Sequence, residues 1–338
     1  MIDLARIKYY LEKAARKRWL LPALLLGVFV VSLVIHQFEL LDPYVQLIAM
    51  YIGINIILTL SLNLINGYMG EFSVGHAGFM AIGAYIASFL TVKVIPAQMI
   101  AWLFPLAVAA GGLGAAVIGL VVAFPSFKTR GDYLAIVTLA FAMIVKSAIE
   151  NIDALGGPRG FLGMEKLATL PWVCFWVMLS LWIIRNLIYS SFGRGVLAIR
   201  EDEIAGDLMS VNTRQVKVLA FTISSFFAGI AGALFAHLLQ FINPRAFDII
   251  KSTDILIMVY LGGIGSIAGS ILGATVYTLL LEILRPLGIW RMVLIPLILV
   301  MLMLYRPKGI MGLREFPWFI PVRDRLASRL WREKRGVS

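Results

Sequence analysis

Residues 254–283 read DILIMVYLGGIGSIAGSILGATVYTLLLEI, an almost uninterrupted apolar run. A helix that crosses the hydrocarbon core of a bilayer needs about 20 apolar residues, so this run is too long for one simple crossing. It also contains the glycine-rich break Leu261 to Gly265. We therefore expect either one tilted helix or two short helices joined at the glycines.

Apolar runs of similar character recur along nearly the whole chain of 338 residues, of which 60% are hydrophobic and 14% charged. Soluble domains are about half apolar and a quarter charged, so lipid is the expected solvent. We predict an all-α polytopic membrane protein with about ten transmembrane helices, some short or broken by Gly-rich segments, and with cytoplasmic coupling helices. The apolar segments lie at 20–36, 44–65, 77–92, 99–124, 131–150, 171–189, 216–240, 254–284 and 288–305.

Positive charge favours the division of segment 254–284 into two. Short cytoplasmic loops collect Lys and Arg, and ten crossings with both termini in the cytoplasm place most of the 30 Lys and Arg on that side. This predicts a basic cytoplasmic N-terminus at 1–19, a transmembrane domain at 20–305 and a basic cytoplasmic or interfacial tail at 306–338. The run after residue 19 lacks a small-residue cleavage site, so we expect a helix there and not a secretory signal.

The net charge of +11 does not indicate nucleic acid binding, because the basic residues gather at the chain ends and in a few connections. Contact with membrane lipid explains them better.

A glycine-rich stretch, NGYMGEFSVGHAGFMAIGAY at 66–85, enters the third apolar segment. Irregular backbone persists at membrane depth only where protein or a water-filled route satisfies its polar groups, so this stretch is a candidate translocation path. The candidate path residues are Asn63, Ser73, Gly75 and His76. The alternative is that the glycines allow close helix packing while Glu71 and His76 lie at the headgroup boundary.

Gly265, Gly269 and Gly273 recur at every fourth residue and are predicted to share one helix face that packs closely against another backbone. The same run contains a formal dinucleotide-binding pattern from Gly263 to Ala268. That pattern needs a preceding strand in a βαβ unit, so it is rejected here.

The longest polar connection between spans is 190–217, and it is rich in both signs of charge. Its apolar residues fall at roughly helical spacing, which predicts one or two short amphipathic helices suited to a partner's groove. These residues are Val196, Ile199, Ile204, Leu208 and Val211. The alternative is a solvated linker stabilised by local Arg and Glu pairs.

Few other residues indicate chemistry. The three histidines, His36, His76 and His237, lack metal-ligand spacing, so no metal site is expected. The single cysteine, Cys174, cannot form an intramolecular disulfide. Lys146 and Glu150 are one turn apart and are expected to pair. No P-loop of the form GxxxxGK[ST] is present, so the chain is not expected to bind ATP by that means. No nucleophile, base or metal cluster converges in the sequence, so a membrane enzyme is the weakest expectation.

Several of these motifs together resemble LivM-type permeases of branched-chain amino acid ABC importers. The resemblance covers about 45–312 and rests on motifs in the family's order: GYMGEFSVGHAGFMAIGAY, TRGDYLAIVTLAFAMIVK, the Gly156-Gly157-x-x-Gly160 loop, GRGVLAIREDEIAGDLMSVNTRQVKVLAF and VYLGGIGSIAGSILGA. Two positions depart from the family pattern: Ser210 stands where a glycine is usual, and Leu155 where a threonine is frequent.

The resemblance implies an assembly in which this chain pairs with a second, LivH-like permease. Two cytoplasmic ATPase subunits would bind ATP and Mg, so the chain itself has no cofactor, and a periplasmic binding protein would deliver the amino acid. The segment from Gly193 would couple the ATPases to transport. Its implied coupling residues are Gly193, Arg194, Arg200, Glu201, Asp202, Glu203, Ala205 and Gly206.

Two alternative functions remain open at this point. A related permease for urea or short amides could use the same scaffold. A self-sufficient ion-coupled transporter would need intramembrane charge pairs, of which the sequence offers few beyond Lys146 and Glu150.

Overall fold

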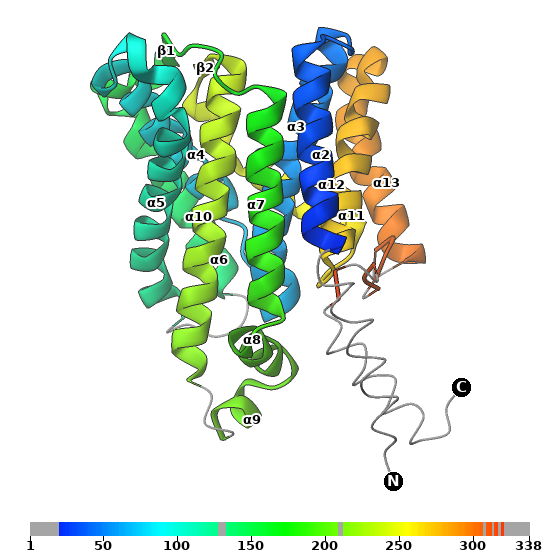
Figure 1. The fold of residues 1–338 in the computed structure, drawn as a ribbon. Coiled ribbons are helices and arrows are strands. Elements are labelled where there is room, and N and C mark those ends of the chain that lie inside the picture. Colours follow the sequence, from blue (N-terminus) through cyan, green and yellow to red (C-terminus); the bar gives the residue numbers. More distant parts are fainter. Residues whose placement is uncertain are drawn as a thin grey trace, which may run out of the picture.

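The protein is described from a computed structural model, which covers residues 20–127, 133–208, 212–306, 309–312, 314–316 and 319–320. These residues form a bundle of long, roughly aligned helices (Figure 1). The α-helices are α2 (Leu20–Gln37), α3 (Pro43–Asn63), α4 (His76–Phe89), α5 (Ile100–Ser126), α6 (Tyr133–Glu150), α7 (Leu170–Ile188), α8 (Ser191–Glu201), α9 (Glu203–Leu208), α10 (Thr213–Leu239), α11 (Ile249–Gly262), α12 (Ile267–Ile283) and α13 (Arg291–Tyr305). The predicted all-α polytopic membrane fold is confirmed.

Six helices are long and apolar enough to cross a membrane. Two of them are extended by π-helical turns, η1 (Leu64–Met69) after α3 and η2 (Leu90–Val94) after α4. The six spans are Pro43–Met69, His76–Val94, Ile100–Ser126, Tyr133–Glu150, Leu170–Ile188 and Thr213–Leu239. In the described part of the chain, α2 and α12 supply two shorter apolar helices, Leu24–Gln37 and Ile267–Ile283. Helices α11 and α13 have 14 and 15 residues.

The remaining elements are short. Residues Phe161–Leu162 (β1) and Phe241–Ile242 (β2) pair antiparallel and join two connections at the end of the bundle opposite α8 (Figure 1). The 3-10 turns are η3 (Ala97–Met99), η4 (Asp153–Leu155), η5 (Gly157–Arg159), η6 (Pro244–Phe247) and η7 (Arg285–Trp290). We call the two ends of the bundle the α8 end and the β end.

Helices α3, α4, α5 and α10 form the buried centre. Gly83 of α4 and Gly229 of α10 meet so closely that a Cβ on Gly83 would lie 2.1 Å from the Gly229 carbonyl oxygen. Phe79 and Phe221, both fully buried, stack edge to face beside this contact, with ring centroids 5.5 Å apart. Small residues bring the backbones together and aromatic rings fill the space around them, a common arrangement for helices packed in lipid.

The long apolar segment divides as predicted. Helix α11 ends at Gly262, and α12 begins at Ile267 after a turn in which Gly263 and Gly265 have φ values of 135° and 76°. Gly269 and Gly273 face α11: a Cβ on Gly269 would lie 3.0 Å from the Gly262 carbonyl oxygen, and one on Gly273 would lie 2.1 Å from that of Met258.

The prediction that Gly265 shares this helix face is wrong. Gly265 precedes the N-cap residue Ser266 and therefore lies in the turn and not on α12. The spacing of the glycines does not show where α12 begins, because the start of the helix is set by its N-cap residue, Ser266. The positive φ of Gly265 explains the residue instead, since side chains with a Cβ rarely adopt that conformation.

Two helices begin within the bundle. Residues 70–75 lead into α4, and the segment after β2 leads into α11. Their first turns lie together, because the backbone N–H of Ala77 donates to the Ser252 hydroxyl at 3.2 Å. Non-helical backbone at membrane depth is tolerated where protein surrounds it, and this contact brings the two breaks to the same place.

Candidate functional site

The four predicted path residues are all buried. Asn63 joins the break between α11 and α12: its amide donates to the Ser266 carbonyl at 2.9 Å and to the Ser270 hydroxyl at 2.7 Å, and its oxygen accepts from Gly265 N–H at 2.8 Å. Gly75 abuts α6, because a Cβ there would lie 2.3 Å from the Thr138 carbonyl oxygen. The structure therefore assigns a backbone-contact position to Gly75.

Ser73 and His76 each keep an unused polar atom. His76 is 1% exposed, and its Nε2 lies 2.7 Å from the Ser61 hydroxyl. Its Nδ1 and the Oγ of Ser73 have no hydrogen-bond partner among the described residues. Buried polar atoms are almost always paired, so these two are the strongest sign that segment 70–76 meets something polar.

The predicted coupling segment forms two helices, α8 and α9, at the end of the bundle opposite β1 and β2 (Figure 1). Ser190 caps α8 by accepting from the Gly193 N–H at 3.2 Å, and Gly193 must lack a side chain because a Cβ would lie 2.0 Å from the Ile188 carbonyl oxygen. Asp202 caps α9 through Ile204 and Ala205 N–H. Arg194, Glu201, Asp202, Glu203 and Ala205 are exposed, Arg200 is half-buried and Gly206 is buried.

The segment forms two short helices, one of the two arrangements that the spacing of its apolar residues predicted. Val196 and Ile199 of α8 are buried against the bundle, at 2% and 5% exposure. Ile204 and Leu208 of α9 point away from it, at 70% and 82% exposure. Asp202 interrupts the helix, so the periodicity does not continue from α8 into α9; Val211 lies outside the described residues. Helix α9 therefore carries an exposed apolar pair one turn apart.

A cluster of three charges links α9 to the break before α4. The Lys217 ammonium of α10 lies 2.5 Å from a Glu71 carboxylate oxygen and 2.8 Å from one of Glu203. The Lys217 side chain is only 7% exposed, whereas Glu203 is 45% exposed. Beside this cluster, Arg200 covers Gly70, where a Cβ would lie 3.1 Å from the Arg200 Cγ. Sequence analysis identified Glu203 and Arg200 but missed Lys217 and the role of Glu71, because no local pattern pairs residues so far apart.

At the same end, Glu315 caps the N-terminus of α12, although it lies far along the chain from that helix. It accepts hydrogen bonds from the N–H groups of Ile267 and Ala268 and, at 2.9 Å, from the Tyr68 hydroxyl. Burial raises the pKa of Glu315, while these donors act in the opposite direction. A helix N-terminus attracts negative charge, but the burial of the Glu315 carboxylate outweighs this attraction.

Lys146 does not pair with Glu150 as expected. Its ammonium instead lies 2.9 Å from Asp248, the N-cap residue of α11. The one-turn spacing on α6 would allow Lys146 to pair with Glu150. Its partner is instead Asp248, which is far away in the sequence and lies where α11 begins.

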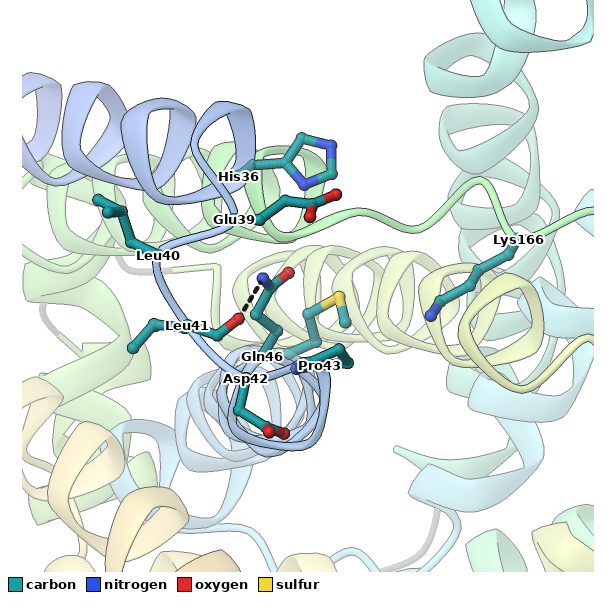
Figure 2. A pocket seen from close by; sticks show the side chains of 9 residues that line it. His36, Glu39, Leu40, Leu41, Asp42, Pro43, Gln46 and Lys166 are labelled. Atoms are coloured by element: carbon teal, nitrogen blue, oxygen red, sulfur yellow. Dashed lines mark hydrogen bonds between the residues drawn. The ribbon is translucent and has the colours of Figure 1, made fainter.

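A polar hollow opens at the β end, between α2 and α3 (Figure 2). Its volume is about 330 Å³, and Lys166 reaches towards it from the connection before α7. The hollow is lined by His36, Glu39, Leu40, Leu41, Asp42, Pro43, Gln46, Met50 and Lys166. It therefore presents both signs of charge on the face opposite α9.

This fold, with interrupted apolar helices and a charged helical segment at one end, defines an integral membrane permease subunit. The family model for the branched-chain amino acid transport system / permease component matches residues 44–304, and the chain belongs to that family.

Among its relatives, the high-affinity branched-chain amino acid transport system permease protein LivM of Escherichia coli (strain K12) is 34% identical, over 76% of this chain and 68% of that one. The probable branched-chain amino acid transport permease protein LivM of Methanocaldococcus jannaschii is 25% identical, over 79% and 92%. The permease protein LivH of Escherichia coli (strain K12) is 25% identical, over 77% and 91%. No solved structure matches the chain.

Proposed function

We propose that this chain is one of two permease subunits in an ATP-driven importer of branched-chain amino acids. In this assembly a LivH-like permease completes the membrane channel, two ATPase subunits bind ATP and Mg on the cytoplasmic side, and a periplasmic binding protein supplies the amino acid. The similarity to the LivM and LivH proteins supports the substrate class and the second permease.

The observation that carries the proposal is the contact of Lys217 with both Glu71 and Glu203. Glu203 belongs to the exposed helix α9, and Glu71 belongs to the break that leads to Ser73 and His76. A partner that moves α9 therefore acts on the interior break through a nearly buried ammonium group. ATPase subunits that prefer one arrangement of α9 would shift the equilibrium between two permease conformations.

The surfaces at the two ends suit different partners. Ile204 and Leu208 offer the ATPase an apolar contact flanked by the charged residues Arg194, Arg200, Glu201 and Asp202. The hollow around Glu39 and Lys166 offers the binding protein a surface with both signs of charge. In this proposal the α8 end faces the cytoplasm, and the β end faces the outside of the inner membrane of a bacterium or archaeon.

The route of the amino acid runs past Asn63, Ser73, Gly75 and His76 in this proposal. The two unpartnered atoms, Ser73 Oγ and His76 Nδ1, support a polar contact there. Because the binding protein selects the substrate, a few polar groups in an otherwise apolar path are sufficient.

The test is uptake of radiolabelled L-leucine into proteoliposomes that contain both permeases and both ATPases, with binding protein added outside and ATP inside. Leucine should accumulate only with all components present. Accumulation of urea instead of leucine would favour the amide permease, and leucine uptake by this chain alone without ATP would favour an ion-coupled transporter.

A further inference from the structure

Helix α11 carries two opposite charges in a largely apolar sequence, IIKSTDILIMVYLG. Lys251 and Asp254 are three residues apart, so they lie on neighbouring turns with Cβ atoms roughly 5–6 Å apart. Charged side chains inside membrane helices are rare, and they usually face an interior or a cavity and serve a function. The fold uses neither residue in the contacts described above.

Asp254 lies near the middle of the membrane-spanning bundle. The span Pro43–Met69 has 27 residues, and Asn55 lies next to its midpoint, roughly 18–21 Å from either end. The Asn55 amide donates to the Thr278 hydroxyl at 2.9 Å. Tyr277, the residue before Thr278, donates a hydrogen bond from its hydroxyl to Asp254. The acidic group is therefore held at the depth of Asn55, far from both headgroup regions.

Neither charge is neutralised by an ion pair with another described residue. Asp254 accepts from Tyr277, which satisfies part of the carboxylate. The Lys251 ammonium lies 5.4 Å from the centroid of the Phe235 ring, a cation–π contact that leaves its N–H donors free for a ligand. The two groups thus keep hydrogen-bonding capacity of opposite kinds.

The two charges lie beside an open face of α11. Ile250 is 71% exposed and Ile249 44%, while Lys251 and Asp254 are half-buried at the edge of this stripe. A ligand that reaches the open face contacts the Lys251 ammonium and the Asp254 carboxylate together with aliphatic side chains. Aliphatic surface with a few placed polar groups is the usual composition of a small-molecule site.

We propose that Lys251 and Asp254 form a recognition site for the zwitterionic head of an α-amino acid at mid-depth in the membrane. The Lys251 ammonium binds the α-carboxylate, the Asp254 carboxylate binds the α-ammonium, and Ile250 contacts the aliphatic side chain. Tyr277 fixes the orientation of Asp254. The inference rests on the proposed function and deepens it, because it names the residues that recognise the substrate after the binding protein has released it.

The experiment uses the complete transporter in proteoliposomes, with L-leucine as the probe. Lys251→Gln and Asp254→Asn each remove one charge at nearly constant volume, while Lys251→Arg and Asp254→Glu keep it. Loss of one charge-assisted contact should reduce kcat/KM for leucine uptake by about tenfold to a hundredfold. The charge-conserving variants should recover most of the loss. The controls Lys93→Gln and Asp153→Asn remove exposed charges near the β end and should leave uptake unchanged.

Two further readouts separate recognition from assembly. ATP hydrolysis stimulated by the liganded binding protein, and recovery of the second permease on purification, should both stay at the wild-type level in Lys251→Gln. In addition, a diazirine analogue of leucine should label residues 249–262 in the wild-type complex, and excess leucine should suppress the labelling.

The proposal is overturned by wild-type uptake in both neutral variants, by labelling confined to other helices, or by loss of the second permease from Lys251→Gln, which would assign the charges to subunit association. If the wild-type complex fails to take up leucine at all, the proposed function falls and this site falls with it. If wild type transports and the variants do so equally well, only the site is refuted.

Discussion

The ammonium of Lys217 lies 2.5 Å from the carboxylate of Glu71, although the two residues are 146 positions apart in the chain. The same ammonium lies 2.8 Å from Glu203. One nearly buried cation thus links the exposed helix α9 to the segment that leads into α4. Removal of one partner from such a buried pair leaves an uncompensated charge, which costs about 3–5 kcal/mol where burial is complete.

Replacement of Lys217 by Met should uncouple the transporter. Glu71 and Glu203 would repel each other without the intervening cation. Movement of α9 would then no longer be transmitted to the segment before α4. Leucine uptake should fall at least about tenfold while ATP hydrolysis by the assembled complex continues. Lys217→Arg, which keeps the charge, should restore most of the uptake. Equal loss of ATP hydrolysis and uptake in Lys217→Met would contradict a coupling role.

On the surface side, Glu203→Ala and Arg200→Glu should reduce uptake without changing membrane insertion. Glu203 is 45% exposed, so its ion pair is partly screened and its loss should be milder than that of Lys217. Uptake per inserted transporter is the measurement. Unimpaired uptake by both variants would count against assigning α9 to the ATPase contact.

Gly273→Ala should destabilise the protein, because the added Cβ would lie 2.1 Å from the Met258 carbonyl oxygen and force α11 and α12 apart. Overpacking of this kind costs about 1–3 kcal/mol, which lowers the Tm by several degrees. The matched control is Gly27→Ala in α2, where a Cβ meets nothing within 4 Å. We expect Gly27→Ala to melt at or above the wild-type temperature and Gly273→Ala to melt clearly below it. Equal melting temperatures of the two variants would argue against close packing at Gly273.

Cysteine labelling should place the two ends of the bundle on opposite sides of the membrane. In a Cys174→Ala background, Leu40→Cys lies at the β end and Ile204→Cys lies on α9; the native residues are 64% and 70% exposed. A membrane-impermeant maleimide added to intact cells should modify Leu40→Cys at once and Ile204→Cys only after permeabilisation. The reverse pattern would invert the topology and remove α9 from the ATPase side.

Glu315 should make stability fall as the pH rises through the acidic range. Its pKa is raised by burial above its ordinary value of 4.5, so the folded state holds this proton to higher pH than the unfolded chain does. The contribution is fully present below pH 4.5 and is lost as the pH passes the raised value. Glu315→Gln should remove this slope in thermal unfolding measurements between pH 4 and 7, values chosen to bracket the transition. An unchanged slope would exclude Glu315 as its source.

The helices could be predicted from sequence because a helix that crosses lipid needs a continuous apolar run. Each run is much longer than the uncertainty in where its helix begins and ends. The division of 254–284 followed from two independent signals, the glycines at 261–265 and the distribution of Lys and Arg. The error at Gly265 shows the limit of this reasoning. A fourth-residue repeat describes a face only within a helix, and the side chain of Ser266 starts α12 one residue after that glycine.

The candidate site was predicted less completely, because its contacts join distant parts of the chain. Asn63, Ser73 and His76 stood out as polar residues near glycines. The structure places Ser73 and His76 at the start of α4, and Asn63 against the turn between α11 and α12. Lys217 gave no such signal, since a lysine in the first turns of an apolar helix is usually an ordinary headgroup contact. The partner of Lys146 was missed for the same reason: Asp248 becomes its neighbour only because α11 begins inside the bundle.

The charge cluster at Lys217 also orders events during synthesis. Glu71 leaves the ribosome long before the cation that balances it, and the intervening chain includes four of the six long spans, from α4 to α7. Until α10 is inserted, the acidic residue can be stabilised only by water or by a headgroup at the membrane surface. The ion pair that fixes the segment before α4 can therefore form only after the later half of the chain is inserted. A protein truncated before residue 217 lacks the cation of this pair.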